Sequence, residues 1–200
     1  MLNERRLVIV AVAIALLIAA LAVFWHPQKS PPIRPAALPA GGDFTLQSAD
    51  GPRALSSFAG RSVLLYFGYT FCPDICPTTL ITLSESLAKL TPQEREKLAV
   101  LFVSVDPERD TPEHLKAYLA FFDAGAIGLT GTAQEVAEIA KRYGVFYSKQ
   151  PVEASSGAYS MDHSAETFLV NPDGRVRARI AHGTPPDEVV AIFRQYLNPQ

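Results

Sequence analysis

Two scarcities limit what this protein can be. The chain has no basic tract, and its 18 lysines and arginines face 20 acidic residues, which leaves a formal charge of −2. This balance gives no reason to expect nucleic-acid binding. Only two cysteines are present, and both lie beyond residue 70. A lipid anchor on an N-terminal cysteine is therefore excluded, and any disulfide within the chain must join these two residues.

An apolar segment near the N-terminus predicts a membrane helix. Residues 7–25 carry no charge, and a helix of that length spans about 28 Å, close to the hydrocarbon core of a bilayer. Arg5 and Arg6 precede the segment and Trp25 closes it. Under the positive-inside rule, residues 1–6 lie in the cytoplasm and everything after the helix lies outside.

A cleaved signal peptide is the main alternative for this segment. Ala20-Leu21-Ala22 resembles the small residues before a cleavage site. The apolar run nevertheless continues to Trp25 without a polar region, which favours a retained, single-pass helix. The segment also lacks the serine- and arginine-rich pattern of an organellar transit peptide. We therefore expect a bacterial inner-membrane protein whose C-terminal domain lies in the periplasm.

Two regions follow the membrane segment. Residues 26–41 contain five prolines, a density typical of an extended, semi-rigid linker that cannot pack a core. Such a linker would hold the rest of the protein away from the membrane surface. Residues 42–200 are long enough to form one domain with a well-buried core.

The apolar pattern of this domain predicts an α/β fold. Continuous apolar runs at 62–67 and 99–105 are typical of parallel strands buried on both faces. An N-terminal hairpin is expected around Asp50-Gly51, and a second hairpin pairs 166–170 with 175–180. Helices are expected at 77–90, 111–122, 132–143 and 184–197, with a short extended segment at 127–129. Residues 145–161 form an inserted loop or hairpin with a small, polar tip.

Both cysteines lie in the motif Cys72-Pro73-Asp74-Ile75-Cys76-Pro77, between the first buried strand and the first helix. Unpaired N–H groups and the helix dipole stabilise thiolates at such a position. Because a proline biases the residue before it away from the helical conformation, we expect Cys76 to be the helix cap and Cys72 a loop residue. These thiolates suit Cu(I) binding or disulfide exchange, and an added imidazole also allows Cu(II). A structural disulfide is a third alternative, although closing so short a loop stabilises a fold little.

Three motifs together resemble the Sco/SenC family of copper-handling proteins. They are YFGYTFCPDICPT at 66–78, VSVDPERDT at 103–111 and YSMDHS at 159–164, in the order found in the family. The resemblance covers roughly 42–197 and includes the membrane helix upstream. It implies a membrane-anchored, thioredoxin-like copper chaperone that helps assemble the binuclear copper centre of cytochrome c oxidase. It also implies Cys72, Cys76 and His163 as the ligands of Cu(I), Cu(II) or both.

His163 lies 87 positions beyond Cys76, and spacing alone does not bring it to the thiols. In thioredoxin-like proteins, the loop before the hairpin strand faces the cysteine turn and commonly ends in a cis-proline that orients disulfide substrates. Residues 164–167 contain no proline here, and the histidine directly precedes them. This departure favours metal binding over disulfide exchange.

The remaining polar candidates have simpler interpretations. Asp106 and Asp110 bracket a turn before a helix, where turn formation and capping explain them, although the resemblance places their motif beside the copper site. Met161 is expected to pack in the core, and His114 to lie on a solvated helix face. His182 is left out of the site.

Two functional hypotheses follow. The leading one is a non-enzymatic metallochaperone that passes copper to the copper-binding subunit of cytochrome c oxidase. The alternative is a thiol-disulfide oxidoreductase that reduces the cysteines of that subunit, a role with no evident use for His163. Other periplasmic copper carriers or thiol reductants are expected partners. A thiol peroxidase fits poorly, because the Thr-x-x-Cys pattern of that class is not met at Thr70-Phe71-Cys72.

Overall fold

This computed structural model describes residues 8–9, 12–18, 20, 37–152, 159–171 and 173–197. The chain divides into two compact units, Met1–Ala37 and Leu38–Gln200. Among the residues that the structure describes, no helix is both long and apolar enough to cross a membrane. Much of the predicted membrane helix at 7–25, its flanking arginines and the linker up to residue 36 lie outside the described residues.

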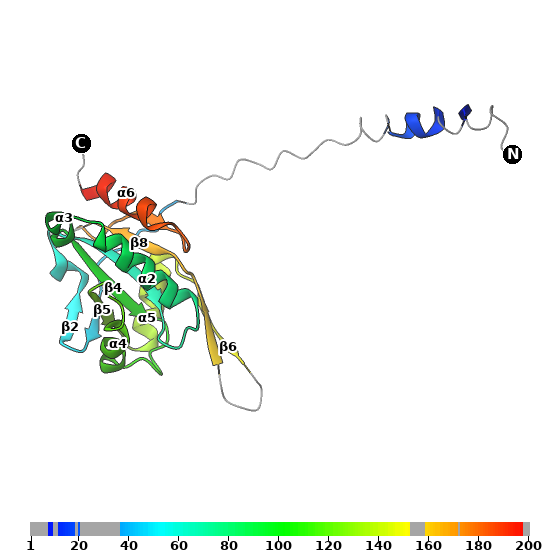
Figure 1. Cartoon of the computed structure of the whole chain (residues 1–200). Coiled ribbons are helices and arrows are strands. Elements are labelled where there is room, and N and C mark those ends of the chain that lie inside the picture. The colour runs from blue at the N-terminus through cyan, green and yellow to red at the C-terminus, as the bar shows by residue number, and fades with distance from the viewer. Residues whose placement is uncertain are drawn as a thin grey trace. The chain divides into compact units, whose positions relative to one another are not determined.

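A five-stranded sheet forms the centre of the second unit (Figure 1). Its strand order is β5-β4-β3-β8-β9. The bounds are β3 Ser62–Gly68, β4 Leu98–Ser104, β5 Ala126–Leu129, β8 Thr167–Val170 and β9 Val176–Ile180. Strands β3, β4 and β5 are parallel, while β8 runs antiparallel to β3 and β9 antiparallel to β8. Every residue of β3 and β4 is buried, which confirms the prediction of strands covered on both faces.

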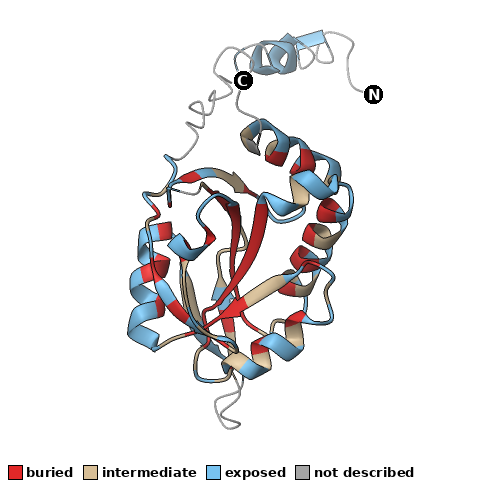
Figure 2. Ribbon diagram, turned by 90° about the vertical axis from the view of Figure 1, so that its left-hand side faces the viewer, coloured by how far each residue is buried: buried red, intermediate tan, exposed pale blue. Residues whose placement is uncertain are grey.

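Helices pack on both faces of this sheet, with the buried residues between the layers (Figure 2). On one face, α2 (Ile75–Ala88) and α6 (Pro186–Leu197) bury a cluster that includes Leu64, Leu83 and Phe193. Helix α4 (Pro112–Leu119) lies on this same face, where Leu115 leaves no room for a Cβ on Gly128 and Tyr118 packs on Phe102. On the other face, α5 (Ala133–Tyr143) packs Tyr143 against Phe67 of β3. Tyr66 therefore faces α2 and its neighbour Phe67 faces α5, as the alternation of side chains along a strand requires.

Local signals explain where several helices begin. Thr132 and Glu135 form a capping box at the start of α5, and Gly144 ends that helix with a positive φ of 66°. The Thr111 side chain accepts from the backbone of His114 at the start of α4. Helix α5 agrees with its predicted range, whereas α4 ends at Leu119, before the predicted end at residue 122. The short helices η1 (Leu55–Phe58) and α3 (Pro92–Glu96) were not predicted from the sequence.

The start of α2 corrects the predicted role of Cys76. Asp74 is the N-cap and the helix begins at Ile75, so Cys76 lies inside the first turn rather than at the cap. Pro77 does not prevent this, because an N–H in the first turn has no helical acceptor and its absence costs little. The helix therefore begins two residues before the predicted start.

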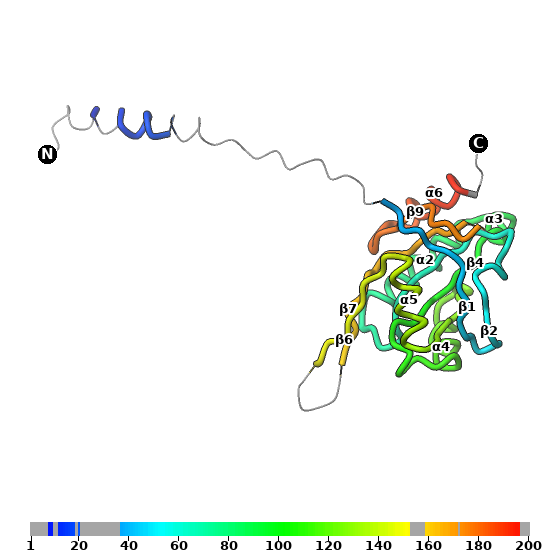
Figure 3. Tube along the Cα trace, turned by 180° about the vertical axis from the view of Figure 1, so that it is seen from behind, coloured from blue at the N-terminus to red at the C-terminus, as the bar shows by residue number. Residues whose placement is uncertain are grey.

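Two hairpins lie outside the central sheet. Strands β1 (Thr45–Ser48) and β2 (Gly51–Ala54) pair as the predicted N-terminal hairpin. Strands β6 (Tyr147–Pro151) and β7 (Tyr159–His163) form a second antiparallel pair in which Tyr147 faces His163. This hairpin extends away from the central sheet (Figure 3). The inserted segment is thus a hairpin, and His163 is the last residue of its second strand.

Candidate metal centre

The cysteine half of the centre follows β3, at the point where the chain leaves the core. The N–H of Cys72 donates to the carbonyl of Tyr69 at 3.3 Å. This bond closes a tight loop, residues 69–74, which we call the cysteine loop. Cys72 is half-buried, whereas Cys76 is fully buried. The N–H of Cys76, in the first turn of α2, donates to Sγ of Cys72 at 3.4 Å. The start of the helix therefore faces one thiol and carries the other.

The two thiols differ in their affinity for a proton. A hydrogen bond from the Cys76 thiol lowers the pKa of Cys72 to about 3, although burial opposes this shift. The same bond and burial raise the pKa of Cys76. Because the two groups share a proton, we assign the thiolate to Cys72 and the thiol to Cys76.

The core fixes the position of Cys76. The Tyr66 hydroxyl donates to Sγ of Cys76 at 3.6 Å, and Tyr66 is itself fully buried. A Cβ on Gly68 would lie 2.8 Å from the same sulfur and 2.9 Å from Cζ of Phe102. Glycine is required at this position because no side chain fits between the strand and the sulfur.

The hairpin β6–β7 supplies the third donor. Nε2 of His163 lies 3.4 Å from Sγ of Cys76, and Nδ1 lies 2.9 Å from the carbonyl of Ser164. A carbonyl only accepts, so Nδ1 carries the proton and Nε2 presents its lone pair to the thiols. The rings of Tyr66 and Tyr69 pack edge-on against the imidazole at 6.3 and 5.7 Å between centroids.

Cys72, Cys76 and His163 thus form a compact donor group. One ligand atom from each residue lies within 4.8 Å of the others, and no second such group of three occurs among the described residues. The two cysteines do not form a disulfide. A groove of about 460 Å³, lined by both strand β7 and the cysteine loop, opens onto Cys72 and His163. Two sulfurs and one imidazole are a soft donor set that suits Cu(I) and, with the nitrogen, Cu(II).

The other candidates lie apart from this group. Nδ1 of His182 lies 2.9 Å from Oγ1 of Thr79. His114 is partly exposed, as expected, with Nδ1 3.9 Å from Oδ1 of Asp110. Met161 is buried in the main core cluster, in agreement with a packing role.

Asp110 was interpreted from the sequence as a turn residue, but the structure gives it a larger role. Its fully buried carboxylate accepts from the backbone N–H and hydroxyl of Thr70 at 3.1 and 2.6 Å, and from the Ser104 hydroxyl at 2.6 Å. It therefore ties the cysteine loop to the end of β4. One signal pointed to this contact: neighbouring parallel strands end at the same edge of a sheet, so the segments after β3 and β4 must meet.

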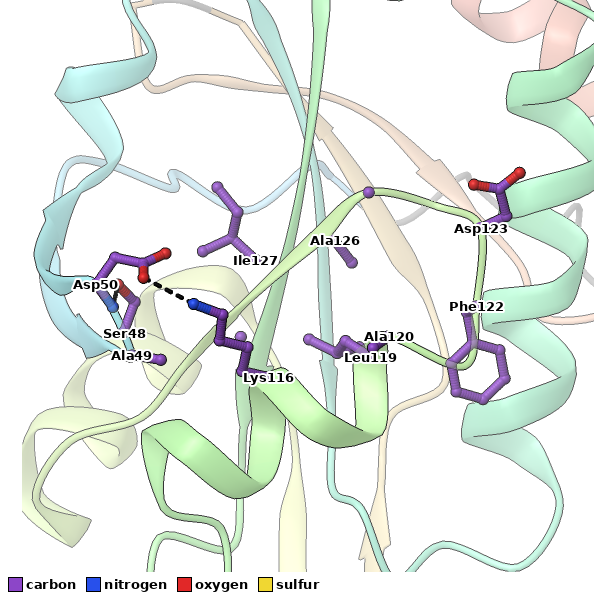
Figure 4. A pocket seen from close by; sticks show the side chains of 12 residues that line it. Ser48, Ala49, Asp50, Lys116, Leu119, Ala120, Phe122, Asp123, Ala126 and Ile127 are labelled. Carbon is purple, nitrogen blue, oxygen red and sulfur yellow. Dashed lines mark hydrogen bonds and ion pairs between the residues drawn. The ribbon is translucent and has the colours of Figure 1, made fainter.

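A second cavity, of about 280 Å³, lies between α4, β5 and the β1–β2 turn (Figure 4). Lys116 reaches across it to Asp50, with Nζ 2.8 Å from Oδ1. Its lining contains neither cysteine nor histidine. The soft donors of the described domain are therefore gathered at the first groove.

The central sheet with helices on both faces, and a cysteine pair between its first strand and the following helix, define a thioredoxin-like protein. A family model described as SCO1/SenC matches residues 34–198. The chain belongs to the SCO1/SenC family.

Known relatives agree with this assignment. The mitochondrial SCO1 homolog 2 of Arabidopsis thaliana is 40% identical over 150 residues, which are 74% of this chain and 54% of the relative. This chain thus spans about half the length of that relative. The copper-bound structure of ScoI from Bradyrhizobium japonicum has a TM-score of 0.71 and 39% identity, and the match covers 78% of this chain and 99% of ScoI.

A third relative is linked to disulfide chemistry. BsSco is described as having a disulfide switch and as a member of the Sco family of cytochrome c oxidase assembly proteins. It shares 26% identity with a TM-score of 0.60, and the match covers 82% of this chain and 97% of BsSco.

Proposed function

We propose that this protein is a copper metallochaperone that binds copper through Cys72, Cys76 and His163 and delivers it to the binuclear centre of cytochrome c oxidase. One observation carries the proposal: three soft or borderline donors from two separate segments converge within 4.8 Å. A metal bound there would be held by thiolates from the helix start and by an imidazole whose lone pair already faces them. Copper is cargo here, since the chaperone must also release it.

Two relatives support copper as the cargo and the oxidase as its destination. The Bradyrhizobium relative holds copper, and the description of BsSco names cytochrome c oxidase assembly. The groove at Cys72 and His163 leaves the donor group open to a partner, as transfer from one protein to another requires. The copper-binding subunit of the oxidase is the proposed acceptor.

Residues 7–25 are proposed to anchor the protein in a bacterial inner membrane, with 26–41 as a linker and 42–200 as the periplasmic domain. The uncharged run and the two arginines before it support this orientation. Reporter fusions after residue 41 and at the N-terminus test it. A periplasmic reporter must be active only in the first fusion, and the chain must stay in the membrane fraction after high-salt washing.

A thiol-disulfide reductase is a second candidate, favoured by the proton distribution between the cysteines. The Cys72 thiolate would attack a disulfide of the acceptor and form a mixed disulfide. Cys76, after losing its proton, would then attack Cys72, releasing the reduced acceptor and leaving a Cys72–Cys76 disulfide. A periplasmic dithiol reductant would have to restore the pair.

The two functions can be separated with one acceptor and one variant. The Cu(I)-loaded full-length protein is mixed with the metal-free copper-binding subunit, and both copper transfer and acceptor thiols are measured. The His163→Ala variant should lose copper retention and transfer while keeping disulfide reduction, with His182→Asn as the control. If His163→Ala transferred copper like the wild type, the chaperone proposal would be wrong as stated.

A further inference from the structure

The two halves of the donor group belong to different sheets. The cysteines follow β3 of the central sheet, whereas His163 ends β7 of a separate two-stranded sheet. Some additional contact must hold the hairpin at the correct distance from the thiols. The contacts that join the outer part of the hairpin to the domain converge on residues 106–110, the segment directly after β4.

Arg109 lies at the centre of these contacts. Its Nε donates to the carboxylate of Asp106, and Nη1 donates to the backbone carbonyl of Tyr159 at 3.0 Å. The guanidinium carbon lies 3.7 Å from the centroid of the Tyr159 ring and 4.6 Å from that of Phe71. Arg109 therefore contacts the first residue of β7 and the residue before Cys72 at the same time.

Neighbouring side chains strengthen this connection on both sides. The Tyr159 hydroxyl donates to Oδ1 of Asp106 at 2.8 Å, and Nζ of Lys149 in β6 lies 2.7 Å from Oε2 of Glu108. On the other side, Asp110 holds Thr70 of the cysteine loop. Within this segment, Asp106, Glu108 and Arg109 thus contact the hairpin, and Asp110 contacts the cysteine loop.

We infer that Arg109 is a positioning residue, which sets the distance of the His163 imidazole from the thiols by holding Tyr159 against Phe71. This inference rests on the proposed function and deepens it. Tyr159 and His163 lie four positions apart on one short strand and so share a face. A shift at the Tyr159 end tilts the strand and moves the imidazole. A planar guanidinium can stack and donate in this way, whereas an ammonium cannot.

The test measures copper affinity of the full-length protein in four forms: wild type, Arg109→Gln, His163→Ala and the double variant. We expect Arg109→Gln to weaken copper binding about tenfold, as loss of a residue that orients a ligand does. It should also weaken the ¹⁴N coupling in the Cu(II) electron paramagnetic resonance spectrum. In the His163→Ala background the same change should cost less than about twofold, because Arg109 acts through His163.

Further variants guard against a simple folding defect. Tyr159→Leu leaves the Arg109–Asp106 pair in place and should reproduce the loss of ¹⁴N coupling, while Tyr159→Phe keeps the ring and should stay close to wild type. Arg109→Lys keeps the charge beside Asp106 but not the flat stack, and should resemble Arg109→Gln. Arg175→Gln is the matched control, since Arg175 is an exposed arginine in the β8–β9 turn at the opposite end of β3.

The outcomes separate this inference from the function on which it rests. Equal losses from Arg109→Gln in the wild-type and His163→Ala backgrounds would overturn the inference, because Arg109 would then act on the fold or the thiols. Unchanged ¹⁴N coupling in Arg109→Gln, or full rescue by Arg109→Lys, would also overturn it. A wild-type protein without nitrogen coupling would instead contradict the proposed ligand set, and the inference with it.

Discussion

The two halves of the donor group are held in very different ways. Cys76 is fully buried in the first turn of α2 and lies against Tyr66 and Gly68 of the central strand. His163 is half-buried at the end of a two-stranded hairpin. The core surrounds the first half, whereas the second is held by one buried side chain of its strand, Met161, together with polar and stacking contacts.

This difference suits a protein that must both acquire and release a metal. A buried thiol next to a thiolate stays in place when the metal leaves, because its surroundings are close-packed. An imidazole at the end of a two-stranded hairpin moves more easily, since such a small sheet opens at low free-energy cost. We therefore expect changes at the thiol half to affect stability, and changes at the imidazole half to affect copper binding and motion.

The largest effect is expected from Gly68→Ala. The new methyl group would lie 2.8 Å from Sγ of Cys76 and 2.9 Å from Cζ of Phe102, both in the core. Overpacking of this kind costs about 1–3 kcal/mol, so thermal unfolding should occur several degrees lower. In a Cys76→Ala background one of the two clashes is gone, and the same change must cost less. Equal costs in both backgrounds would show that the thiol half is not tightly held.

A comparable loss of stability is expected from Asp110→Asn. The amide can still accept one or two bonds, but it turns a donor toward Thr70 or Ser104 and leaves a buried group poorly paired. Such a change costs about 1–3 kcal/mol and should loosen the cysteine loop without changing the hairpin. Denaturant unfolding measures the cost, with Asp187→Asn on the surface as control. A variant as stable as the wild type would contradict the role given to Asp110.

The pKa difference between the cysteines predicts unequal alkylation. The pKa of Cys72 is lowered to about 3 and that of Cys76 is raised. Iodoacetamide should therefore modify Cys72 at pH 5–8 with little dependence on pH, with the rate falling only as pH approaches the lowered pKa. Since the folded state favours the Cys72 thiolate, the stability from this group also decreases as pH falls toward 3.

Mass spectrometry assigns the modified residue, and a Cys72→Ser variant should react very slowly. Cys76 is fully buried and keeps its proton, so its rate should stay low even at pH 9. A Cys72 rate that increased tenfold per pH unit between 6 and 8 would contradict the assignment of the thiolate.

The smallest effect is expected in hydrogen exchange. Copper should slow the exchange of amides in β6 and β7, because a metal–imidazole bond ties the hairpin to the thiols, and it should leave β3 unchanged. The comparison uses the same protein with and without copper, and the His163→Ala variant as control. Identical exchange of residues 147–151 and 159–163 in both forms would show that the hairpin is already as fixed as the core.

Local sequence patterns predicted much of the fold. The apolar runs of β3 and β4 and the Thr132–Glu135 capping box act through neighbouring residues, so they are visible without a structure. The start of α2 was predicted two residues late. A residue before a proline tends to avoid the helical conformation, and this tendency was given too much weight, because the first turn of a helix tolerates proline.

The site depends on contacts that no local pattern encodes. His163 reaches Cys76 across 87 positions, and it was suggested only by the resemblance to a known family and its thioredoxin-like fold. Arg109 and Asp110 look like turn residues in the sequence. A turn before a helix has the same composition whether its side chains face solvent or connect the two halves of a site. Their roles become visible only when the hairpin and the cysteine loop are placed together.

Copper X-ray absorption of the loaded full-length protein tests the central claim most directly. The account predicts two sulfur and one nitrogen neighbour in the Cu(II)-loaded wild type, with the nitrogen contribution lost in His163→Ala and one sulfur lost in Cys76→Ser. A spectrum with sulfur neighbours alone, or one that His163→Ala left unchanged, would contradict the claim that both halves of the group bind one copper ion.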